Sequence, residues 1–152
     1  QVESLIINTI KQTFPDHHIY GEESGGTLDS SSPLWIIDPI EGTTNFLHGI
    51  PVFGTQLVVV YQDQIIVAAM YDPVSQTLVS AATGQPTLIN QSLAHLSPQS
   101  LKDITLLFDT GRDQKLAYLF LNQNIIPQFR SFRRLGSLVT DVNLGKITPD
   151  TG

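Results

Sequence analysis

The 152-residue sequence contains no cysteine. A disulfide framework and a thiolate metal site are therefore excluded, and any metal must be bound by oxygen or imidazole ligands. The lack of cysteine is compatible with a reducing compartment, and we expect a cytoplasmic protein. Long apolar runs are missing too. None approaches the roughly 20 residues that a membrane-spanning helix needs, so we expect no membrane partner.

Basic residues are scarce. Eight lysines and arginines stand against 14 aspartates and glutamates, which gives a net charge of −6. We therefore expect no nucleic-acid partner, because such binding requires a positively charged surface. A small anionic substrate is still compatible with this charge, since bound metal ions reverse the local field. Hydrophobic residues make up 41% of the chain, which is enough to form a folded domain.

Hydrophobic spacing predicts a mixture of helices and strands. Apolar residues recur at helical spacing over residues 2–14, and Pro15 ends that helix. The apolar run 34–37 predicts a buried strand that ends at Asp38 because Pro39 breaks it. The remaining expected elements are a short helix over 43–47, an antiparallel meander of strands over 55–62, 65–71 and 77–82, further strands over 104–108 and 129–133, and helices over 114–121 and 137–144. Together they predict one α+β domain, a layered α/β sandwich in which helices flank a largely antiparallel sheet.

Three polar residues, Asp38, Glu41 and Thr43, lie close together directly after the predicted strand. Pro39 and Gly42 turn the chain sharply and so bring the two carboxylates to one side. Two close carboxylates repel each other unless a cation lies between them. Oxygen ligands of this kind select magnesium, calcium or manganese. The cluster therefore indicates a site for a divalent cation.

The same turn offers a place for phosphate. The backbone N–H groups of Gly42, Thr43 and Thr44 stand at the start of a predicted helix, where such groups lack helical partners. A divalent cation next to bound phosphate is what transfer of a phosphoryl group to water requires. The simpler interpretation, which the short stretch by itself favours, is a strand that ends in a polar turn.

Two longer segments carry a resemblance to a known family. Residues 21–24 read Gly-Glu-Glu-Ser, and residues 35–46 read Trp-Ile-Ile-Asp-Pro-Ile-Glu-Gly-Thr-Thr-Asn-Phe. They resemble the signature of the inositol monophosphatase family of magnesium-dependent, lithium-sensitive phosphatases, and the resemblance continues through residues 71–74 to 133–137. It implies hydrolysis of a small phosphate monoester, inositol monophosphate or a related sugar phosphate, by metal-activated water. It also implies two or three Mg²⁺ ions, with Mn²⁺ as an alternative, and a homodimer, which is common in the family.

The resemblance also assigns roles to single residues. Glu22 is similar to the first metal-binding carboxylate, and Asp38 to the ligand that bridges two metals. Ile40 would give its backbone carbonyl to one of these ions, and Glu41 stands where the family has its next metal carboxylate. Glu22, Asp38 and Thr43 would form the catalytic set, with Thr43 positioning the attacking water.

Substrate-binding roles fall on two segments. The N–H groups of Gly42 and Thr43, together with Thr44, would hold the phosphate. Gly136 and Ser137 resemble a segment that contacts the sugar or inositol ring in the family. The same pair is equally suited to begin a helix, because serine is a good N-cap.

The sequence departs from the family pattern in three ways. Glu41 replaces an aspartate, and the extra methylene moves the carboxylate outward. The chain lacks an Asp-rich segment with a helix ahead of Gln1, and a Trp-Asp pair after the glycine helix. We therefore expect residues 1–152 to form a single, partial phosphatase domain without the N-terminal helical segment and the C-terminal region. The alternative interpretation is an impaired or non-catalytic relative that binds metal or phosphate weakly, or acts as a subunit.

Overall fold

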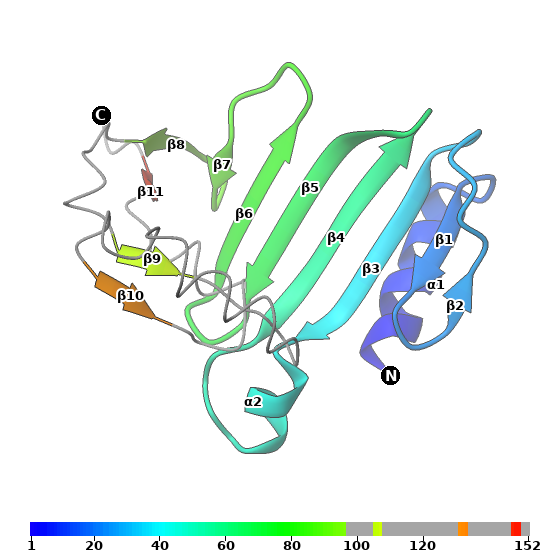
Figure 1. Ribbon diagram of the computed structural model, residues 1–152. Coiled ribbons are helices and arrows are strands. Elements are labelled where there is room, and N and C mark those ends of the chain that lie inside the picture. The colour runs from blue at the N-terminus through cyan, green and yellow to red at the C-terminus, as the bar shows by residue number, and fades with distance from the viewer. Residues whose placement is uncertain (97–104, 108–130, 134–146, 150–152) are drawn as a thin grey trace, which may run out of the picture.

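In the computed structural model, which describes residues 1–96, 105–107, 131–133 and 147–149, the chain forms one large mixed sheet and a separate two-stranded sheet (Figure 1). The strand order of the large sheet is β11-β8-β7-β6-β5-β4-β3-β1-β2, and β9 pairs with β10. The strands are β1 (His18–Gly21), β2 (Gly25–Gly26), β3 (Leu34–Glu41), β4 (Gly54–Tyr61), β5 (Gln64–Asp72), β6 (Thr77–Ala82), β7 (Leu88–Ile89), β8 (Ser92–Leu96), β9 (Thr105–Leu107), β10 (Ser131–Arg133) and β11 (Ile147–Pro149).

Antiparallel pairing dominates the large sheet, whereas β1 and β3 pair in parallel. The predicted fold class, an α+β structure with a largely antiparallel sheet, is confirmed. The predicted meander is formed by β4, β5 and β6. The predicted strands 104–108 and 129–133 are present as the shorter β9 and β10. The predicted helices 114–121 and 137–144 lie outside the described residues.

A tight hairpin joins β4 to β5. Tyr61 pairs with Gln64, so the loop consists of Gln62 and Asp63 alone. Both loop residues have positive φ, 50° and 60°. Two left-handed residues in a two-residue loop match the right-handed twist of the flanking strands. The turn therefore helps to set the register of β4 against β5.

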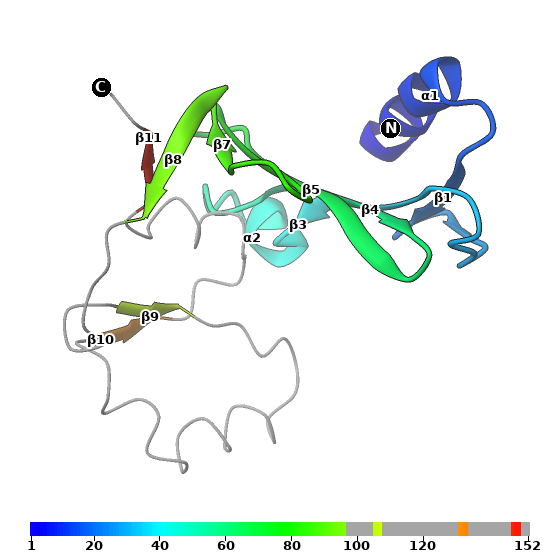
Figure 2. The ribbon, with the colours of Figure 1, turned by 90° about the horizontal axis from the view of Figure 1, so that it is seen from above.

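The helix α1 (Val2–Thr13) lies on one face of the sheet, next to β1 and β3 (Figures 1 and 2). It confirms the predicted helix and ends before Pro15, as expected. Beyond its end, the ring centroids of Phe14 and Trp35 lie 5.8 Å apart. The Nε1–H of Trp35 donates to Nδ1 of His17 at 3.0 Å. Trp35 is therefore a packing residue that ties the end of the helix to β3.

The strand β3 does not end at Pro39, so the prediction of a break there is wrong. The strand continues to Glu41, and its register against β4 shifts between Asp38 and Glu41, which marks a β-bulge. Proline lacks an N–H group and is accommodated in sheets at such bulges. The Pro39 carbonyl is satisfied by Thr55, whose Oγ1–H donates to it at 2.9 Å.

The best-buried apolar side chains lie where β3 and β4 cross the centre of the sheet. Leu34, Ile37 and Val59 are 3%, 1% and 4% exposed. Many large apolar side chains elsewhere are exposed, among them Leu5, Leu28, Leu47, Ile65, Val74 and Leu93. Exposed apolar side chains favour contact with another surface where they lie next to one another. In the described part of the chain, no helix combines the length and apolar character needed to cross a membrane.

We expect the isolated 152-residue chain to associate with itself, because exposed apolar side chains such as Leu5 (68% exposed) and Ile65 (61%) favour contact between copies. Light scattering after size-exclusion chromatography should show dimers or larger species that increase with concentration. The double variant Leu5→Ser, Ile65→Ser should shift this distribution toward monomer, whereas the exposed-site control Asn8→Ser should not. A chain that is monomeric at every concentration and melts cooperatively at high temperature would contradict the expectation.

Candidate active site

The candidate site lies at the carboxyl ends of β1 and β3, which pair in parallel. Gly21 is opposite Ile37 in this register, and the N–H of Glu22 donates to the Ile37 carbonyl at 2.9 Å. Glu22 and Asp38 therefore both directly follow the last paired residues of the β1–β3 ladder, at the same end of it. Asp38 is half-buried, whereas Glu22 is exposed. The parallel pairing thus brings together two acids that are well separated in the sequence.

The chain turns sharply after β3 into α2 (Thr43–Leu47), which confirms the predicted short helix (Figure 1). Gly42 makes this turn with φ 84° and ψ 35°, a left-handed conformation that glycine adopts without steric cost. The Ile40 N–H donates to Asp38 Oδ1 at 3.1 Å, and the Thr43 Oγ1–H donates to the Ile40 carbonyl at 2.9 Å. These bonds hold Asp38, Ile40 and Thr43 in one local arrangement.

The acids of the site act on one another. Desolvation raises the pKa of Asp38 to about 6, a hydrogen bond with Glu41 and repulsion by its charge add to the rise, and the Ile40 N–H opposes it. Desolvation also raises the pKa of Glu22, and repulsion from Asp38 is the next cause. A neighbouring carboxyl therefore disfavours the ionisation of Asp38 and of Glu22. A positive charge between them would relieve this repulsion.

The donor chemistry of the site suits a divalent cation. Glu22, Asp38 and Glu41 offer carboxylate oxygens and Ile40 a carbonyl, which are the hard donors that Mg²⁺ and Mn²⁺ prefer. Among the residues that the structure describes, no group of three or more acidic or histidine side chains is arranged so that it could hold a metal. The described residues therefore match a metal site in ligand chemistry and supply only part of a coordination shell.

A buried amide lies on the neighbouring strand. Gln56 of β4 is directly opposite Asp38, so the two side chains project from the same face of the sheet. The Nε2 atom of Gln56 is buried and has no hydrogen-bond partner within the described ranges. Leaving such a donor unsatisfied costs about 1–3 kcal/mol. An acceptor oxygen bound beside Asp38, such as one from a phosphate group, would satisfy it.

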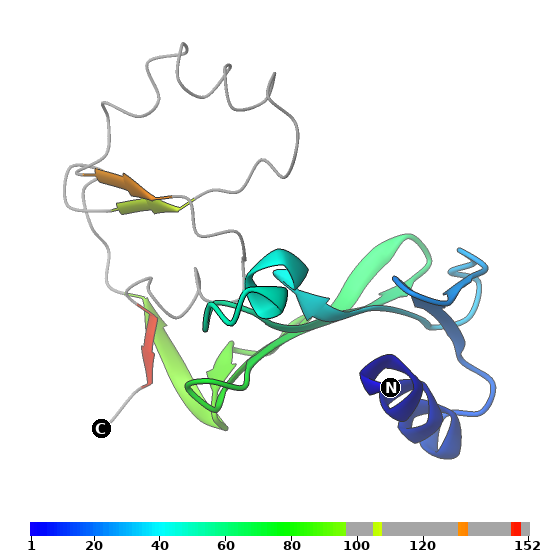
Figure 3. The same cartoon turned by 90° about the horizontal axis from the view of Figure 1, so that it is seen from below.

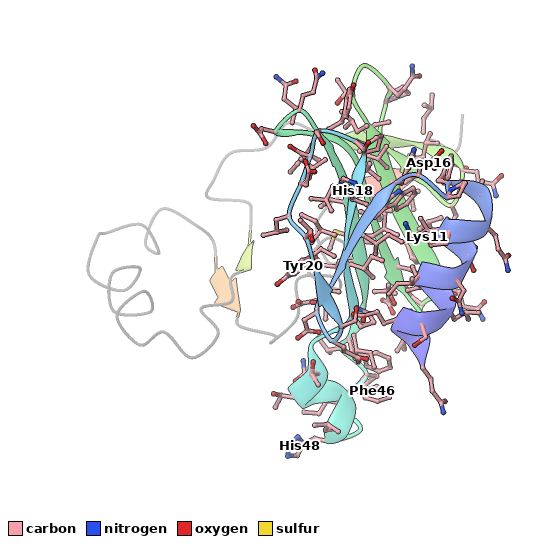
Figure 4. All side chains as sticks on the ribbon, turned by 90° about the vertical axis from the view of Figure 1, so that its right-hand side faces the viewer. Lys11, Asp16, His18, Tyr20, Phe46 and His48 are labelled. Atoms are coloured by element: carbon pink, nitrogen blue, oxygen red, sulfur yellow. The ribbon has the colours of Figure 1, made fainter. Side chains whose placement is uncertain are left out.

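The structure brings together the predicted site residues of the first half of the chain, namely Glu22, Asp38, Ile40, Glu41, Gly42, Thr43 and Thr44. Gly136 and Ser137 lie outside the described residues, so their contact with substrate stays a prediction. His48 is exposed in the region of α2, and its Nδ1 pairs with the Thr44 carbonyl at 2.8 Å. His18 lies toward the opposite end of the molecule from His48 (Figure 4).

One acid that contacts this region was not predicted from the sequence. Glu3 of α1 is only 3% exposed, and its carboxylate accepts hydrogen bonds from the N–H groups of Glu23 and Ser24, both at 2.9 Å. A signal was available in the sequence. Glu3 shares one helix face with the apolar residues Ile6 and Ile10, and an acid in an apolar stripe is buried only when it is paired.

Replacing Asp38 by asparagine should stabilise the metal-free protein above pH 6. Below the ordinary pKa of 3.8 the carboxyl is protonated in both the folded and the unfolded state. Between pH 3.8 and about 6 the unfolded chain releases the proton first, so the folded state loses stability as the pH rises. Asparagine avoids this loss, which we estimate at roughly 1–2 kcal/mol after allowing for solvent screening.

Urea denaturation with a chelator present would measure this gain. It should be full at pH 7.5 and vanish near pH 3.5, and the exposed control Asp16→Asn should show no comparable gain. An equal effect of Asp38→Asn at both pH values would contradict the assignment.

Comparison with known proteins relates this site to a family. The model of the inositol monophosphatase family matches residues 1–137. A protein named Nus factor SuhB from Pasteurella multocida is 33% identical over 148 residues, which cover 92% of this chain and 54% of that protein. The fold resembles extragenic suppressor protein suhB from Bartonella henselae, with TM-score 0.82, 28% identity and coverage of 93% of this chain and 56% of that one. It also resembles an IMPase from Thermotoga maritima, with TM-score 0.79, 27% identity and coverage of 95% and 57%.

The chain spans about half the length of the curated relatives that it matches. The matched residues 1–137 include the whole arrangement described above, from Glu3 through Glu22 and Asp38 to α2. The structural similarity likewise covers nearly the entire chain. The chain therefore belongs to the inositol monophosphatase family.

Proposed function

We propose that the protein is a metal-dependent phosphoric monoester hydrolase that acts on inositol monophosphate or a related sugar phosphate. The observation that carries this proposal is the position of Glu22 and Asp38 next to each other at the end of the β1–β3 ladder, with Asp38 on the strand that leads into α2. Membership of the inositol monophosphatase family supports the phosphatase class. The oxygen-only ligand chemistry supports Mg²⁺, with Mn²⁺ as an alternative.

The residues of the site have two proposed roles, binding the metal and orienting the attacking water. Glu22, Asp38, Glu41 and the Ile40 carbonyl would hold Mg²⁺. The bound ion supplies two effects, a lowered pKa of a water ligand and neutralisation of charge on the phosphoryl group. Thr43 already donates its hydroxyl hydrogen to the Ile40 carbonyl. Its oxygen is therefore directed as an acceptor, and it would orient the attacking water.

Phosphate binding is assigned to the start of α2. The left-handed Gly42 turns the chain so that its own N–H and those of Thr43 and Thr44 begin the helix, where backbone N–H groups attract anions. The buried Nε2 of Gln56 would add a further donor on the same face as Asp38. Gly136 and Ser137 would contact the substrate ring.

A second candidate is a non-catalytic role in which the protein binds a partner. The relatives named Nus factor SuhB, at 31–33% identity, favour this alternative. The exposed apolar side chains of the sheet and α1 would suit such a role. The catalytic and non-catalytic candidates differ in one measurable property, metal-dependent turnover.

The catalytic proposal predicts phosphate release that requires Mg²⁺. The intact protein should hydrolyse inositol monophosphate or another member of a panel of sugar phosphates, and chelation of the metal should reduce the rate to background. Asp38→Asn should lower kcat by at least about a hundredfold, because it removes a carboxylate that would hold the metal. The exposed control Asp16→Asn should retain the wild-type rate. No turnover by a folded protein would favour the non-catalytic candidate.

Glu41→Asp should raise kcat by about tenfold to a hundredfold, because displacement of a catalytic ligand by roughly 1 Å carries a cost of this order. In the structure Glu41 engages Asp38 through a hydrogen bond between the two carboxyls. Mg²⁺ requires ligand distances of roughly 2.0–2.1 Å in octahedral geometry, which a shorter side chain would meet better. Steady-state kinetics at saturating Mg²⁺ would measure the change, with Glu41→Gln as an inactive control. Equal or lower activity of Glu41→Asp would contradict the expectation.

A further inference from the structure

The buried carboxylate of Glu3 in α1 accepts hydrogen bonds from the loop that carries Glu22. Glu3 is only 3% exposed, although it lies in the first turn of a surface helix. Its Oε2 accepts the N–H of Glu23 at 2.9 Å, and its Oε1 accepts the N–H of Ser24 at 2.9 Å. Both carboxylate oxygens are therefore used on two consecutive amides that directly follow Glu22.

Gly21, the residue before Glu22, leaves room for this carboxylate because it has no side chain. Gly21 is buried, and a Cβ atom added to it would overlap the Glu3 carboxylate. Its φ angle is not among the positive values, so space and not backbone conformation requires glycine here. The close approach of Glu3 to the loop therefore depends on the missing side chain at this position.

These contacts fix Glu22 from two directions. Its own N–H donates to the Ile37 carbonyl at 2.9 Å, one residue before Asp38. The next two amides donate to the carboxylate of Glu3 in α1. The backbone of Glu22 is thus clamped between β3 and α1, while its side chain stays exposed at the strand end.

The charge of Glu3 is maintained by the same bonds. Desolvation by burial raises the pKa of this carboxyl, but hydrogen bonds from Glu23 and Ser24 outweigh it, and the pKa lies below its ordinary value. An ionised carboxylate accepts stronger hydrogen bonds from backbone N–H groups than a neutral side chain does. A simple favourable interaction with the positive end of the helix would not require burial or contact with the loop.

We propose that Glu3 is a positioning residue that holds the loop 22–24 so that Glu22 reaches a divalent cation beside Asp38. This inference rests on the proposed function, because it gives Glu22 the role of a metal ligand. Glu3 itself touches neither metal nor substrate in this assignment. Partners that orient metal ligands in this way typically change metal affinity or activity by roughly 10–100-fold when they are replaced.

The test compares Mg²⁺ binding by the intact wild-type protein with binding by three variants, using isothermal titration calorimetry. Glu3→Gln keeps the size of the side chain and removes the charge and one acceptor. Gly21→Ala keeps Glu3 and pushes its carboxylate away from the loop. Asp16→Asn is the matched control, since it exchanges an exposed acid for its amide at the far end of α1 (Figure 4). Circular dichroism and thermal melting show which variants are folded.

We expect Glu3→Gln and Gly21→Ala each to weaken Mg²⁺ binding by about 10–100-fold, with Asp16→Asn unchanged. The Mg²⁺ concentration for half-maximal turnover should rise by the same factor, while KM for the phosphate monoester changes less than about threefold. Wild-type Mg²⁺ affinity in a folded Glu3→Gln variant would overturn the inference. If Glu3→Gln does not fold, wild-type affinity in folded Gly21→Ala overturns it instead.

The two proposals fail in different ways. A wild-type protein that binds Mg²⁺ but hydrolyses no phosphate monoester refutes the proposed function, and weaker binding in the variants would still support the role of Glu3. An active wild-type protein whose variants bind Mg²⁺ normally refutes the role of Glu3 alone.

Discussion

The parallel register of β1 with β3 is the constraint on which the candidate site depends. It is enforced by backbone hydrogen bonds, including the one from Glu22 to the Ile37 carbonyl. This register fixes the backbone positions from which the side chains of Glu22 and Asp38 extend. Burial is the main cause that raises the pKa of both Asp38 and Glu22, and a neighbouring carboxyl adds to the rise, Glu41 for Asp38 and Asp38 for Glu22. The same arrangement that destabilises the metal-free site makes a divalent cation favourable there.

Two local irregularities of the backbone then arrange the residues that follow Asp38. The bulge around Pro39 redirects the end of β3, and the left-handed Gly42 turns the chain into α2 within a few residues. Bulges next to sites are a common device for aiming a side chain. In this chain the bulge places Asp38, the Ile40 carbonyl and Thr43 within one hydrogen-bonded segment. A regular strand would have sent alternate residues to opposite faces of the sheet.

The helix α1 contacts both the strand and the loop that carry the acids of the candidate site. In the part of the chain that the structure describes, few apolar residues are buried, and most of those lie on β3 and β4. Figure 3 shows α1 beneath the sheet. Near one end of the helix, the buried Glu3 accepts hydrogen bonds from the N–H groups of Glu23 and Ser24. Beyond the other end, Phe14 packs near the ring of Trp35. The helix therefore supports the strand that carries Asp38 and the loop that carries Glu22 together.

The sequence by itself determined the local elements and the chemical type of the site. Helical spacing and Pro15 predicted α1, the apolar run predicted β3, and the residues from Asp38 to Thr44 indicated an oxygen-ligand site beside a helix start. Local signals are readable because hydrophobic periodicity and turn residues act over a few positions. The strand break predicted at Pro39 was wrong because a bulge accommodated the proline, and a bulge is defined only by pairing with β4.

Tertiary structure alone decided which distant residues meet. The side-by-side placement of Glu22 and Asp38 follows from the β1–β3 register, and the burial of Glu3 against the amides of Glu23 and Ser24 follows from how α1 lies on the sheet. Neither contact has a local signature, because strand pairing and helix docking join segments far apart in the chain. The sequence predicted which acids form the site, and the fold determined which of them lie close enough to interact.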